Sequence, residues 1–186
     1  MKIIFLDIDG VIQPTWKQDR FKHDMEALRA EIAEKYNEPE YLEFNKYDLA
    51  ATYADWSEVA LTNLRKLFVE QGAKAVISSD WRRSHTLRRL QLLFRLYDLQ
   101  DYIIDCTEIL DKETRGAEIQ AYIEAHPEIT KFVILDDLRF DFHTRFPNEW
   151  VQCLGFLNDE HRINAERVLN GELQILPEKK SNGWYL

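Results

Sequence analysis

Two aspartates near the start of the chain are the residues best placed to do chemistry. Asp7 and Asp9 follow the apolar run 2–6 directly, and Gly10 comes next. In an open α/β sheet, ligands bind outside the carboxyl ends of the strands. If the apolar run is a strand of such a sheet, the acid pair predicts a site that binds a cation or moves a proton.

A second acid pair follows another apolar run. Asp136 and Asp137 come after the run 131–135, and Asp141 lies four residues beyond Asp137. Two acidic strand ends placed side by side repel each other strongly unless a cation lies between them. Carboxylate oxygens in this number suit Mg²⁺, which also accepts an oxygen from a phosphate. The two pairs together predict a magnesium site.

Polar side chains between the two acid pairs are suited to holding a phosphate. Ser78 and Ser79 end a third apolar run, where a hydroxyl can donate to a phosphoryl oxygen. Arg115 stands in the first turn of a predicted helix, where a cation opposes the helix dipole and a bound anion would offset that cost. Arg82 could extend this phosphate pocket, or it could belong to a solvated helix start with Arg83.

The elements that position these residues alternate along the chain. Apolar segments of strand length occur at 2–6, 73–78, 102–104, 131–135 and 150–154. Helical patterns separate them; Asp55 with Glu58 is a candidate capping box for one helix, and Thr114 is a candidate N-cap for another. Near-continuous apolar strands alternating with helices predict a parallel α/β sheet covered on both faces.

The segment 13–54 breaks this alternation. It is polar, and it contains a helical pattern at about 22–36. Connections in compact domains are usually short, so a long one needs a purpose. We interpret it as a small helical cap inserted after the first strand, with residues 1–12 and 55–176 as the core domain and 177–186 as a C-terminal tail. The alternative is an elaborated surface excursion.

With these residues the chain resembles the haloacid dehalogenase-like (HAD) hydrolase superfamily. The four motifs of that superfamily occur in order. They are matched by Asp7-Ile8-Asp9-Gly10 after a strand, Ser79 (or Ser78 in the alternative register), Arg115 (or the nearby Lys112), and Asp136-Asp137 with Asp141 downstream. The combination of Ser-Ser-Asp-Trp-Arg with Arg-Gly-Ala-Glu-Ile is similar to the HAD domain of Swiss Army Knife RNA-repair proteins and their stand-alone relatives.

The resemblance implies a Rossmann-like fold with a five-stranded parallel sheet, and a phosphatase that works through an aspartyl-phosphate. Asp7 would be the nucleophile, and Asp9 would protonate the leaving oxygen and then activate water. Mg²⁺ would bind the Asp7 carboxylate, the Asp9 backbone carbonyl and Asp137, with Asp136 or Asp141 binding through water. Ser79 and Arg115 would stabilise the phosphoryl oxygens, and Gly10, Arg82 and Lys112 are further candidates for substrate binding.

Composition narrows the classes of function. The formal net charge of −9 argues against a general nucleic-acid binder, and no apolar run approaches bilayer length. Cys106 and Cys153 are too few for a disulfide framework, so we expect both to be buried apolar residues in a cytoplasmic protein. Nothing in the sequence predicts the oligomeric state.

Three functions are therefore compared. The first is a phosphomonoesterase that acts on a small phosphorylated metabolite or nucleotide. The second is a phosphatase that processes polynucleotide ends, and the third is a non-catalytic binding domain of the same fold. Intact Asp7, Asp9, Ser79, Arg115 and Asp137 favour an enzyme over a binding domain.

Overall fold

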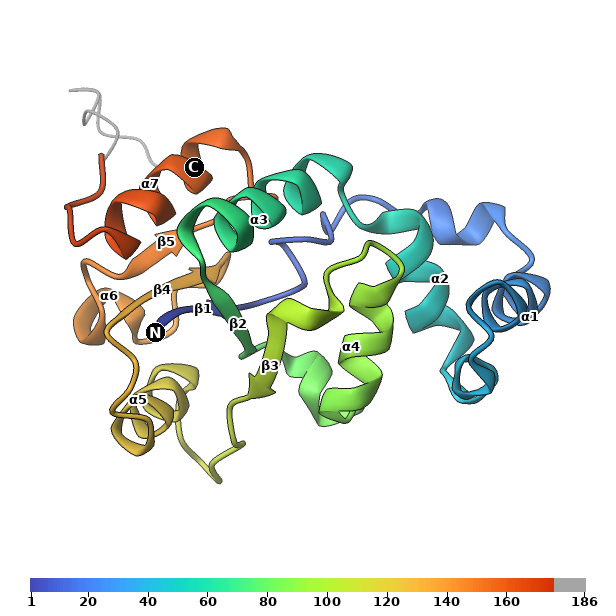
Figure 1. Ribbon diagram of the computed structural model, residues 1–186, viewed down its shortest axis with the longest axis horizontal. Coiled ribbons are helices and arrows are strands. Elements are labelled where there is room, and N and C mark those ends of the chain that lie inside the picture. Colours follow the sequence, from blue (N-terminus) through green and yellow to red (C-terminus); the bar gives the residue numbers. More distant parts are fainter. Residues whose placement is uncertain (176–186) are drawn as a thin grey trace.

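The computed structural model describes residues 1–175, which form a five-stranded sheet with helices around it (Figure 1). All neighbouring strands are parallel, in the order β3-β2-β1-β4-β5. The strands are β1 (Lys2–Leu6), β2 (Lys74–Ile77), β3 (Ile103–Cys106), β4 (Lys131–Asp136) and β5 (Trp150–Gln152). The predicted parallel sheet is confirmed, and β1 has the predicted bounds.

Helices cover both faces of the sheet (Figure 1). On one face lie α3 (Glu58–Gln71) and α7 (Asp159–Leu169), and on the other lie α5 (Arg115–Ala125) and α6 (Phe142–Arg145). The helix α4 (Leu87–Arg95) contacts the edge strand β3. The short helices η3 (Asp80–Arg83) and η4 (Gln100–Tyr102) connect β2, α4 and β3.

The central strand β1 is buried on both sides because its side chains alternate between two apolar clusters. Ile4 and Leu6 belong to the larger cluster with α3 and α7, whereas Ile3 and Phe5 belong to the smaller cluster with α5 and α6. Each of these four side chains is inaccessible to solvent. This double burial explains why the run is apolar at successive positions instead of alternating with polar residues.

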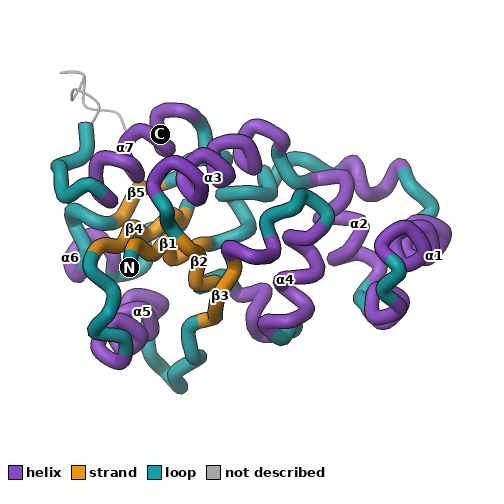
Figure 2. The backbone as a smooth tube through the Cα atoms, in the orientation of Figure 1, coloured by secondary structure: helices purple, strands orange, loops and turns teal. Residues whose placement is uncertain are grey.

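The segment 13–54 is helical and lies beyond the carboxyl end of β1 (Figure 2). It contains η1 (Asp19–Lys22), α1 (Met25–Tyr36) and η2 (Pro39–Glu43), and most of α2 (Lys46–Asp55) falls within it. We call this segment the helical insert.

The helical insert shares its hydrophobic core with the sheet. Ile32, Tyr41 and Phe44 of the insert are buried in the same cluster as Leu6 of β1. The Tyr41 hydroxyl donates to the backbone carbonyl of Leu92 in α4, at 2.7 Å. The arginines of α4 form ion pairs with glutamates of the insert, namely Arg88 and Arg95 with Glu38, and Arg89 with Glu40 and Glu43.

The helix that follows the insert does not begin as predicted. Ser57, not Asp55, is the N-cap of α3, and its side chain accepts from the amide of Ala60 at 3.3 Å. Asp55 belongs to α2 and is fully buried, where its carboxylate accepts from the backbone amide of Arg20 at 2.9 Å and from its Nε at 2.5 Å. Asp55 therefore forms an ion pair with Arg20 instead of capping α3. The predicted N-cap Thr114 of α5 is confirmed.

Other expectations concern the cysteines, the membrane and the tail. Both cysteines are free thiols; Cys153 is buried as expected, but Cys106 is partly exposed, because β3 is an edge strand. Within residues 1–175, no helix has both the length and the apolar character that a bilayer crossing requires. The predicted C-terminal tail, 177–186, lies outside the described residues.

Candidate active site

The first acid pair lies in a tight turn after β1. The amide of Asp7 still donates to Leu135 of β4, at 3.0 Å, so Asp7 continues the strand. The amide of Ile8 donates to Oδ1 of Asp7 at 2.9 Å, which fixes the direction of the carboxylate. The chain then turns back, because the amides of Val11, Ile12 and Gln13 all donate to the carbonyl of Ile8. This turn places Asp7 and Asp9 at the carboxyl edge of the sheet.

Gly10 is required at this turn for two reasons. Its φ is +72°, in the left-handed region that other residues rarely adopt. A Cβ atom at this position would also lie 2.2 Å from Oδ2 of Asp137. The glycine therefore lets the carboxylate that follows β4 pack directly against the turn that follows β1.

Three carboxylates meet at the edge of the sheet. Oxygens of Asp7, Asp136 and Asp137 all lie within 4.8 Å of one another. Burial raises the pKa of Asp136 to about 7, and the charge of Asp7 adds to the effect. Burial and the charge of Asp7 also raise the pKa of Asp137. Burial and the neighbouring charge thus both favour the protonated form of these carboxyls, and a hard divalent cation bound among them would balance their negative charge.

Arg115 of α5 is buried beside this cluster. Its Nη1 lies 3.0 Å from Oδ2 of Asp7 and 2.7 Å from Oδ2 of Asp136, and its Nη2 lies 3.6 Å from Asp80. Burial alone would lower the pKa of the guanidinium, but the charges of Asp7 and Asp136 outweigh it and raise the pKa. The ring of Phe140 packs 4.6 Å from the guanidinium carbon. The structure therefore brings the predicted helix-start cation into contact with the predicted nucleophile.

Ser78 and Ser79 lie at the end of β2, next to β1. Ser78 continues the sheet, because its amide donates to Leu6 at 3.1 Å. Its buried hydroxyl has no hydrogen-bond partner among residues 1–175. The Ser79 hydroxyl accepts from the amide of Trp81 at 3.4 Å, which leaves its own proton free to donate. Both serines remain candidates for a phosphoryl contact.

Arg82 does not occupy a substrate-facing or a solvated position. Its side chain is 2% exposed and forms an ion pair with the buried Glu118 of α5. Its Nη1 donates to the carbonyl of Ser79 at 2.6 Å and also to that of Ser78. Both predictions for Arg82, substrate binding and a solvated helix start, are at odds with this geometry. A cation five residues after a strand end can fold back under the strand, and the sequence alone does not reveal its buried partner.

Asp141 lies outside the acid cluster and is bonded to other groups. Its carboxylate accepts from the Thr114 hydroxyl at 2.7 Å, from the amide of Gly116 at 3.1 Å and from Nε of Arg145 at 2.9 Å. Burial opposes these bonds, but they lower the pKa of Asp141. The prediction that Asp141 binds the metal is therefore at odds with the structure, since this carboxylate stabilises the N-terminus of α5.

Lys112 is exposed on the loop before α5, and it forms no ion pair with another described residue. Its φ of 61° marks a turn. Arg115, not Lys112, is the cation that touches the acid cluster. The structure therefore gives no contact that would support Lys112 as a substitute for Arg115.

Asp9 is held apart from the acid cluster by two donors. Nε2 of Gln13 donates to Oδ1 of Asp9 at 3.1 Å, and Nε1 of Trp81 donates to Oδ2 at 2.9 Å. Protein atoms packed around the carboxyl raise the pKa of Asp9; the Trp81 bond opposes this, and the charge of Asp7 adds to it. Sequence reasoning missed both contacts. A signal for Gln13 was its spacing of four residues from Asp9, and Trp81 directly follows Ser79-Asp80.

Comparison with known families agrees with this geometry. The family described as the HAD domain in Swiss Army Knife RNA repair proteins matches residues 3–159. This range contains the acid cluster, Ser79 and Arg115. The chain belongs to this family. The HAD assignment made from the four motifs is thereby confirmed, as is the Rossmann-like HAD fold. Searches of curated proteins and of solved structures each gave no significant match.

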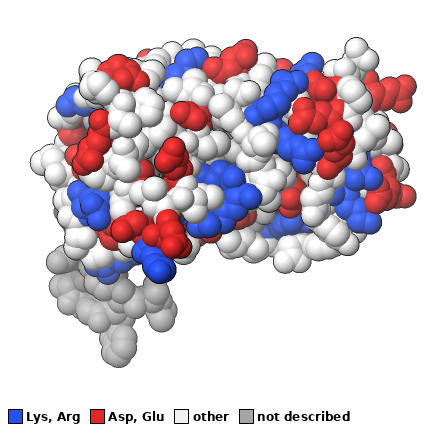
Figure 3. Space-filling model, turned by 90° about the horizontal axis from the view of Figure 1, so that it is seen from below, with Lys and Arg blue, Asp and Glu red and all other residues white. Residues whose placement is uncertain are grey.

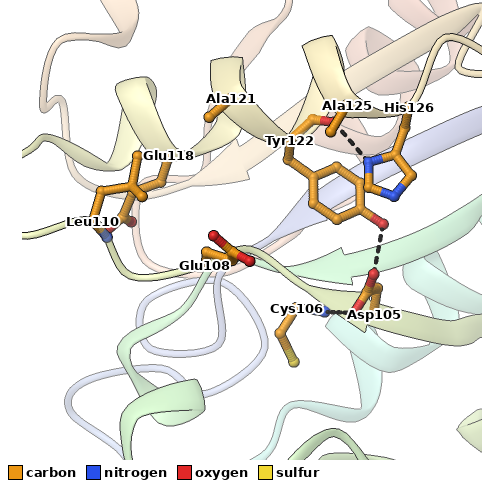
Figure 4. Close-up of a pocket in the computed structure, with 9 residues that line it drawn as sticks. All are labelled: Asp105, Cys106, Glu108, Leu110, Glu118, Ala121, Tyr122, Ala125 and His126. Carbon is orange, nitrogen blue, oxygen red and sulfur yellow. Dashed lines mark hydrogen bonds between the residues drawn. The ribbon is translucent and has the colours of Figure 1, made fainter.

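This HAD domain also has a separate pocket of about 240 Å³ along β3 and α5 (Figure 4). Asp105 and Tyr122 face each other there, and the Tyr122 hydroxyl donates to Asp105 at 3.0 Å. The His126 ring stacks on that of Tyr122, with centroids 3.9 Å apart. Burial raises the pKa of Cys106 in this pocket to about 11, so its thiol is a poor nucleophile. None of the residues predicted for the catalytic site lines this pocket.

Proposed function

We propose that this HAD domain is a magnesium-dependent phosphomonoester hydrolase that works through an aspartyl-phosphate on Asp7. The observation that carries the proposal is the meeting of Asp7 with Asp136 and Asp137, within 4.8 Å, beside the buried cation of Arg115. A carboxylate between a cation-binding cluster and a fixed guanidinium is suited to attack a phosphoryl group, whose oxygens need positive charge on both sides.

In the first step an oxygen of Asp7 attacks phosphorus, and the bond from phosphorus to the leaving oxygen breaks. Asp9 gives its proton to that oxygen, so the alcohol leaves neutral. Its raised pKa helps it to hold the proton that it gives. Water then attacks the phosphorus of the aspartyl-phosphate and passes a proton to Asp9, which restores the Asp7 carboxylate and releases phosphate.

The residues present fit a magnesium ion. Asp7, Asp136 and Asp137 offer hard oxygen ligands within 4.8 Å of one another, and the single positive charge of Arg115 balances only part of their negative charge. Bound Mg²⁺ would neutralise charge on the phosphoryl oxygens. Arg115 and Ser79 would hold the remaining oxygens, as proposed from the motifs. Asp141 has no part in this proposal, because its carboxylate binds Thr114, Gly116 and Arg145.

Hydrolysis of p-nitrophenyl phosphate by the purified protein tests this proposal. We expect turnover with Mg²⁺ that a chelator abolishes and that added Mg²⁺ restores. Asp7→Asn should lower kcat by at least about 10³-fold, since it removes the nucleophile. Asp98→Asn is the matched control, because Asp98 is exposed and has the positive φ that asparagine tolerates. Unchanged turnover in Asp7→Asn would show that another group attacks the phosphate.

For the substrate we propose a small phosphorylated metabolite or nucleotide, with a polynucleotide end as the second candidate. The family name refers to RNA repair proteins, and aromatic side chains are exposed on the segments that follow β1 and β4. Trp16 is 64% exposed, Phe21 62% and Phe140 41%. Of these rings, that of Phe140 lies 4.6 Å from the guanidinium carbon of Arg115, and an exposed ring beside a phosphate site can stack on a nucleobase.

The negative net charge of the protein favours the smaller substrate. The net charge is −9, and acidic and basic side chains alternate on the face drawn in Figure 3. Long nucleic acids are held mainly by phosphate contacts to Lys and Arg. An oligonucleotide with a 3′-phosphate should be compared with the corresponding mononucleotide. A higher kcat/KM for the mononucleotide is expected, whereas a strong preference for the oligonucleotide would favour end processing.

A further inference from the structure

Both oxygens of the Asp9 carboxyl are held by neutral donors from different parts of the chain. Trp81 donates to Oδ2 through its indole Nε1 at 2.9 Å, and Gln13 donates to Oδ1 through Nε2 at 3.1 Å. A carboxyl held at both oxygens has one orientation and cannot rotate freely about its χ2 angle.

Trp81 is itself fixed on several sides. Its backbone amide donates to Ser79 Oγ at 3.4 Å, which ties it to the end of β2. Its ring lies against Trp56, with centroids 6.3 Å apart, and against His85, with centroids 5.8 Å apart. His85 is in turn bonded to Asp48 of the helical insert at 3.2 Å. The indole N–H is therefore aimed at Asp9 by residues of both the sheet and the insert.

Gln13 is fixed by the turn after β1. Its amide donates to Ile8 at 2.9 Å, and its carbonyl accepts from Gly10 at 2.8 Å. Its side chain is mostly buried, and its Oε1 has no hydrogen-bond partner among the described residues. The side-chain amide of Gln13 therefore lacks a hydrogen bond at Oε1 but keeps the bond from Nε2 to Asp9. A residue that only filled space would not need a polar side chain here.

We propose that Trp81 and Gln13 are positioning residues that aim the Asp9 carboxyl at the leaving oxygen of the substrate. This inference rests on the proposed phosphatase function. As the bond between phosphorus and the leaving oxygen breaks, its electron pair goes to that oxygen and the proton of Asp9 joins it. Proton transfer of this kind requires hydrogen-bond distance and alignment, so a freely rotating Asp9 would be a poorer acid.

The experiment uses two substrates that differ in their need for an acid. Phenyl phosphate releases a phenol with a pKa of about 10, whereas p-nitrophenyl phosphate releases a more stable anion that needs less protonation. The ratio of kcat/KM for the two substrates measures the contribution of the acid up to the first irreversible step. A loss of folded enzyme lowers both values equally, so the ratio remains informative even if a variant is partly unfolded.

Trp81→Phe keeps an aromatic ring against Trp56 and His85 but removes the N–H donor, and Gln13→Leu removes the other donor. We expect each variant to lose about 10-fold more kcat/KM on phenyl phosphate than on p-nitrophenyl phosphate. Asp9→Asn removes the proposed acid itself, so it should show the largest difference in kcat/KM loss between the two substrates. Tyr47→Phe, a change at an exposed aromatic residue of α2 with no bond to Asp9, should leave the ratio as in the wild type.

The outcomes separate this inference from the function on which it rests. If the wild-type protein hydrolyses both substrates but the ratio is unchanged in Trp81→Phe and Gln13→Leu, the positioning role is refuted and the phosphatase function stands. An unchanged ratio in Asp9→Asn would refute it too, because Asp9 would then not be the acid. If the wild-type protein hydrolyses neither substrate, the proposed function itself fails.

Discussion

Nη1 of Arg115 lies 3.0 Å from Oδ2 of Asp7, and both side chains are buried. The same nitrogen is 2.7 Å from Asp136, so a single cation lies against two of the three clustered carboxylates. The charge of this site is thus only partly balanced by the protein. Arg115 contacts both Asp7 and Asp136, so we expect it to contribute to stability as well as to the proposed catalysis.

Replacing Arg115 should reveal both roles. Arg115→Met leaves Asp7 and Asp136 buried without their cation, and such a loss typically destabilises a protein by about 3–5 kcal/mol. It should also lower kcat by about 100-fold or more, because the phosphoryl oxygens lose a charged donor. Urea unfolding and p-nitrophenyl phosphate turnover measure the two effects. Arg167→Met on the far helix α7 removes an exposed pair with Glu172 and an exposed bond to the carbonyl of Leu173, and it should change neither by much. Equal stability of Arg115→Met and Arg167→Met would contradict this account.

We expect Arg82 to contribute to stability because it holds the backbone that follows β2. Arg82→Met leaves Glu118 buried without a partner and frees the carbonyls of Ser78 and Ser79, so we expect a loss of about 3 kcal/mol. The double variant Arg82→Met/Glu118→Met should be less destabilised than the sum of the single variants, since no unpaired charge remains. Chemical denaturation of the four proteins of this cycle gives the coupling energy.

The neighbouring arginine is the matched control for Arg82. Arg83 is exposed and pairs with Asp80 three residues earlier, at 2.9 Å. Exposed pairs of this kind contribute less than about 1 kcal/mol. Arg83→Met should therefore leave the free energy of unfolding nearly unchanged. If Arg82→Met were equally harmless, Arg82 would not support the strand end.

Gly10 and Gly72 form a matched pair for testing the contact with Asp137. Both have positive φ, +72° and +63°, so alanine is strained at either position. Only at Gly10 would a Cβ meet another group, at 2.2 Å from Asp137, since nothing lies within 4 Å at Gly72. Gly72→Ala should destabilise by about 1 kcal/mol. Gly10→Ala should destabilise by more and should also weaken Mg²⁺ binding, measured by titration calorimetry. Equal effects of the two variants would show that Asp137 moves away without consequence.

Stability without metal should fall as the pH rises. The pKa of Asp136 is raised to about 7 and that of Asp137 is also raised, whereas an aspartate in the unfolded chain titrates near about 3.9. The folded state therefore binds these protons more tightly, and the stability they supply below about pH 4 is lost as the pH rises through the folded pKa values. The lowered pKa values of Asp80 and Asp141 act in the opposite sense only near and below about pH 4, whereas the pKa of His161, lowered by burial, acts in the opposite sense up to about pH 6.5.

Melting temperatures measured between about pH 6.5 and about pH 8, above the range in which His161 titrates, test this expectation. With a chelator, Tm should fall across the range. With Mg²⁺ it should fall less or rise, because the ion binds ionised carboxylates and stabilises only the folded state. A Tm that rises with pH in the presence of chelator would contradict the raised pKa values of the cluster.

Much of the fold could be predicted because its signal is local. β1 is central and buried on both faces, so every residue from Ile3 to Leu6 is apolar and the strand is recognisable in isolation. Glycine at positions 10 and 72 and the cap at Thr114 similarly mark turns and helix ends that depend on nearby residues. The acid pairs follow such strands, and parallel strands bring their ends together at one edge.

The roles of individual polar residues could not be predicted, because they depend on partners far away in the chain. Asp137 joins the acid cluster whereas Asp141 binds the start of α5, although both follow the same strand. Arg82 is buried because Glu118, 36 residues later, lies beneath it. Asp55 was expected to cap a helix, but Arg20 draws it into the interior. Spacing in the sequence does not distinguish these cases.

The helical insert and the sheet share one hydrophobic core, and this limits which parts of the protein can be exchanged. Ile32, Tyr41 and Phe44 would leave a large apolar surface uncovered on α4 if the insert were cut out, so the insert is not an exchangeable module. Hinged closure over a substrate would have to break the same packing. We therefore expect substrate selectivity to change through single substitutions near the acid cluster, not through replacement of the whole insert.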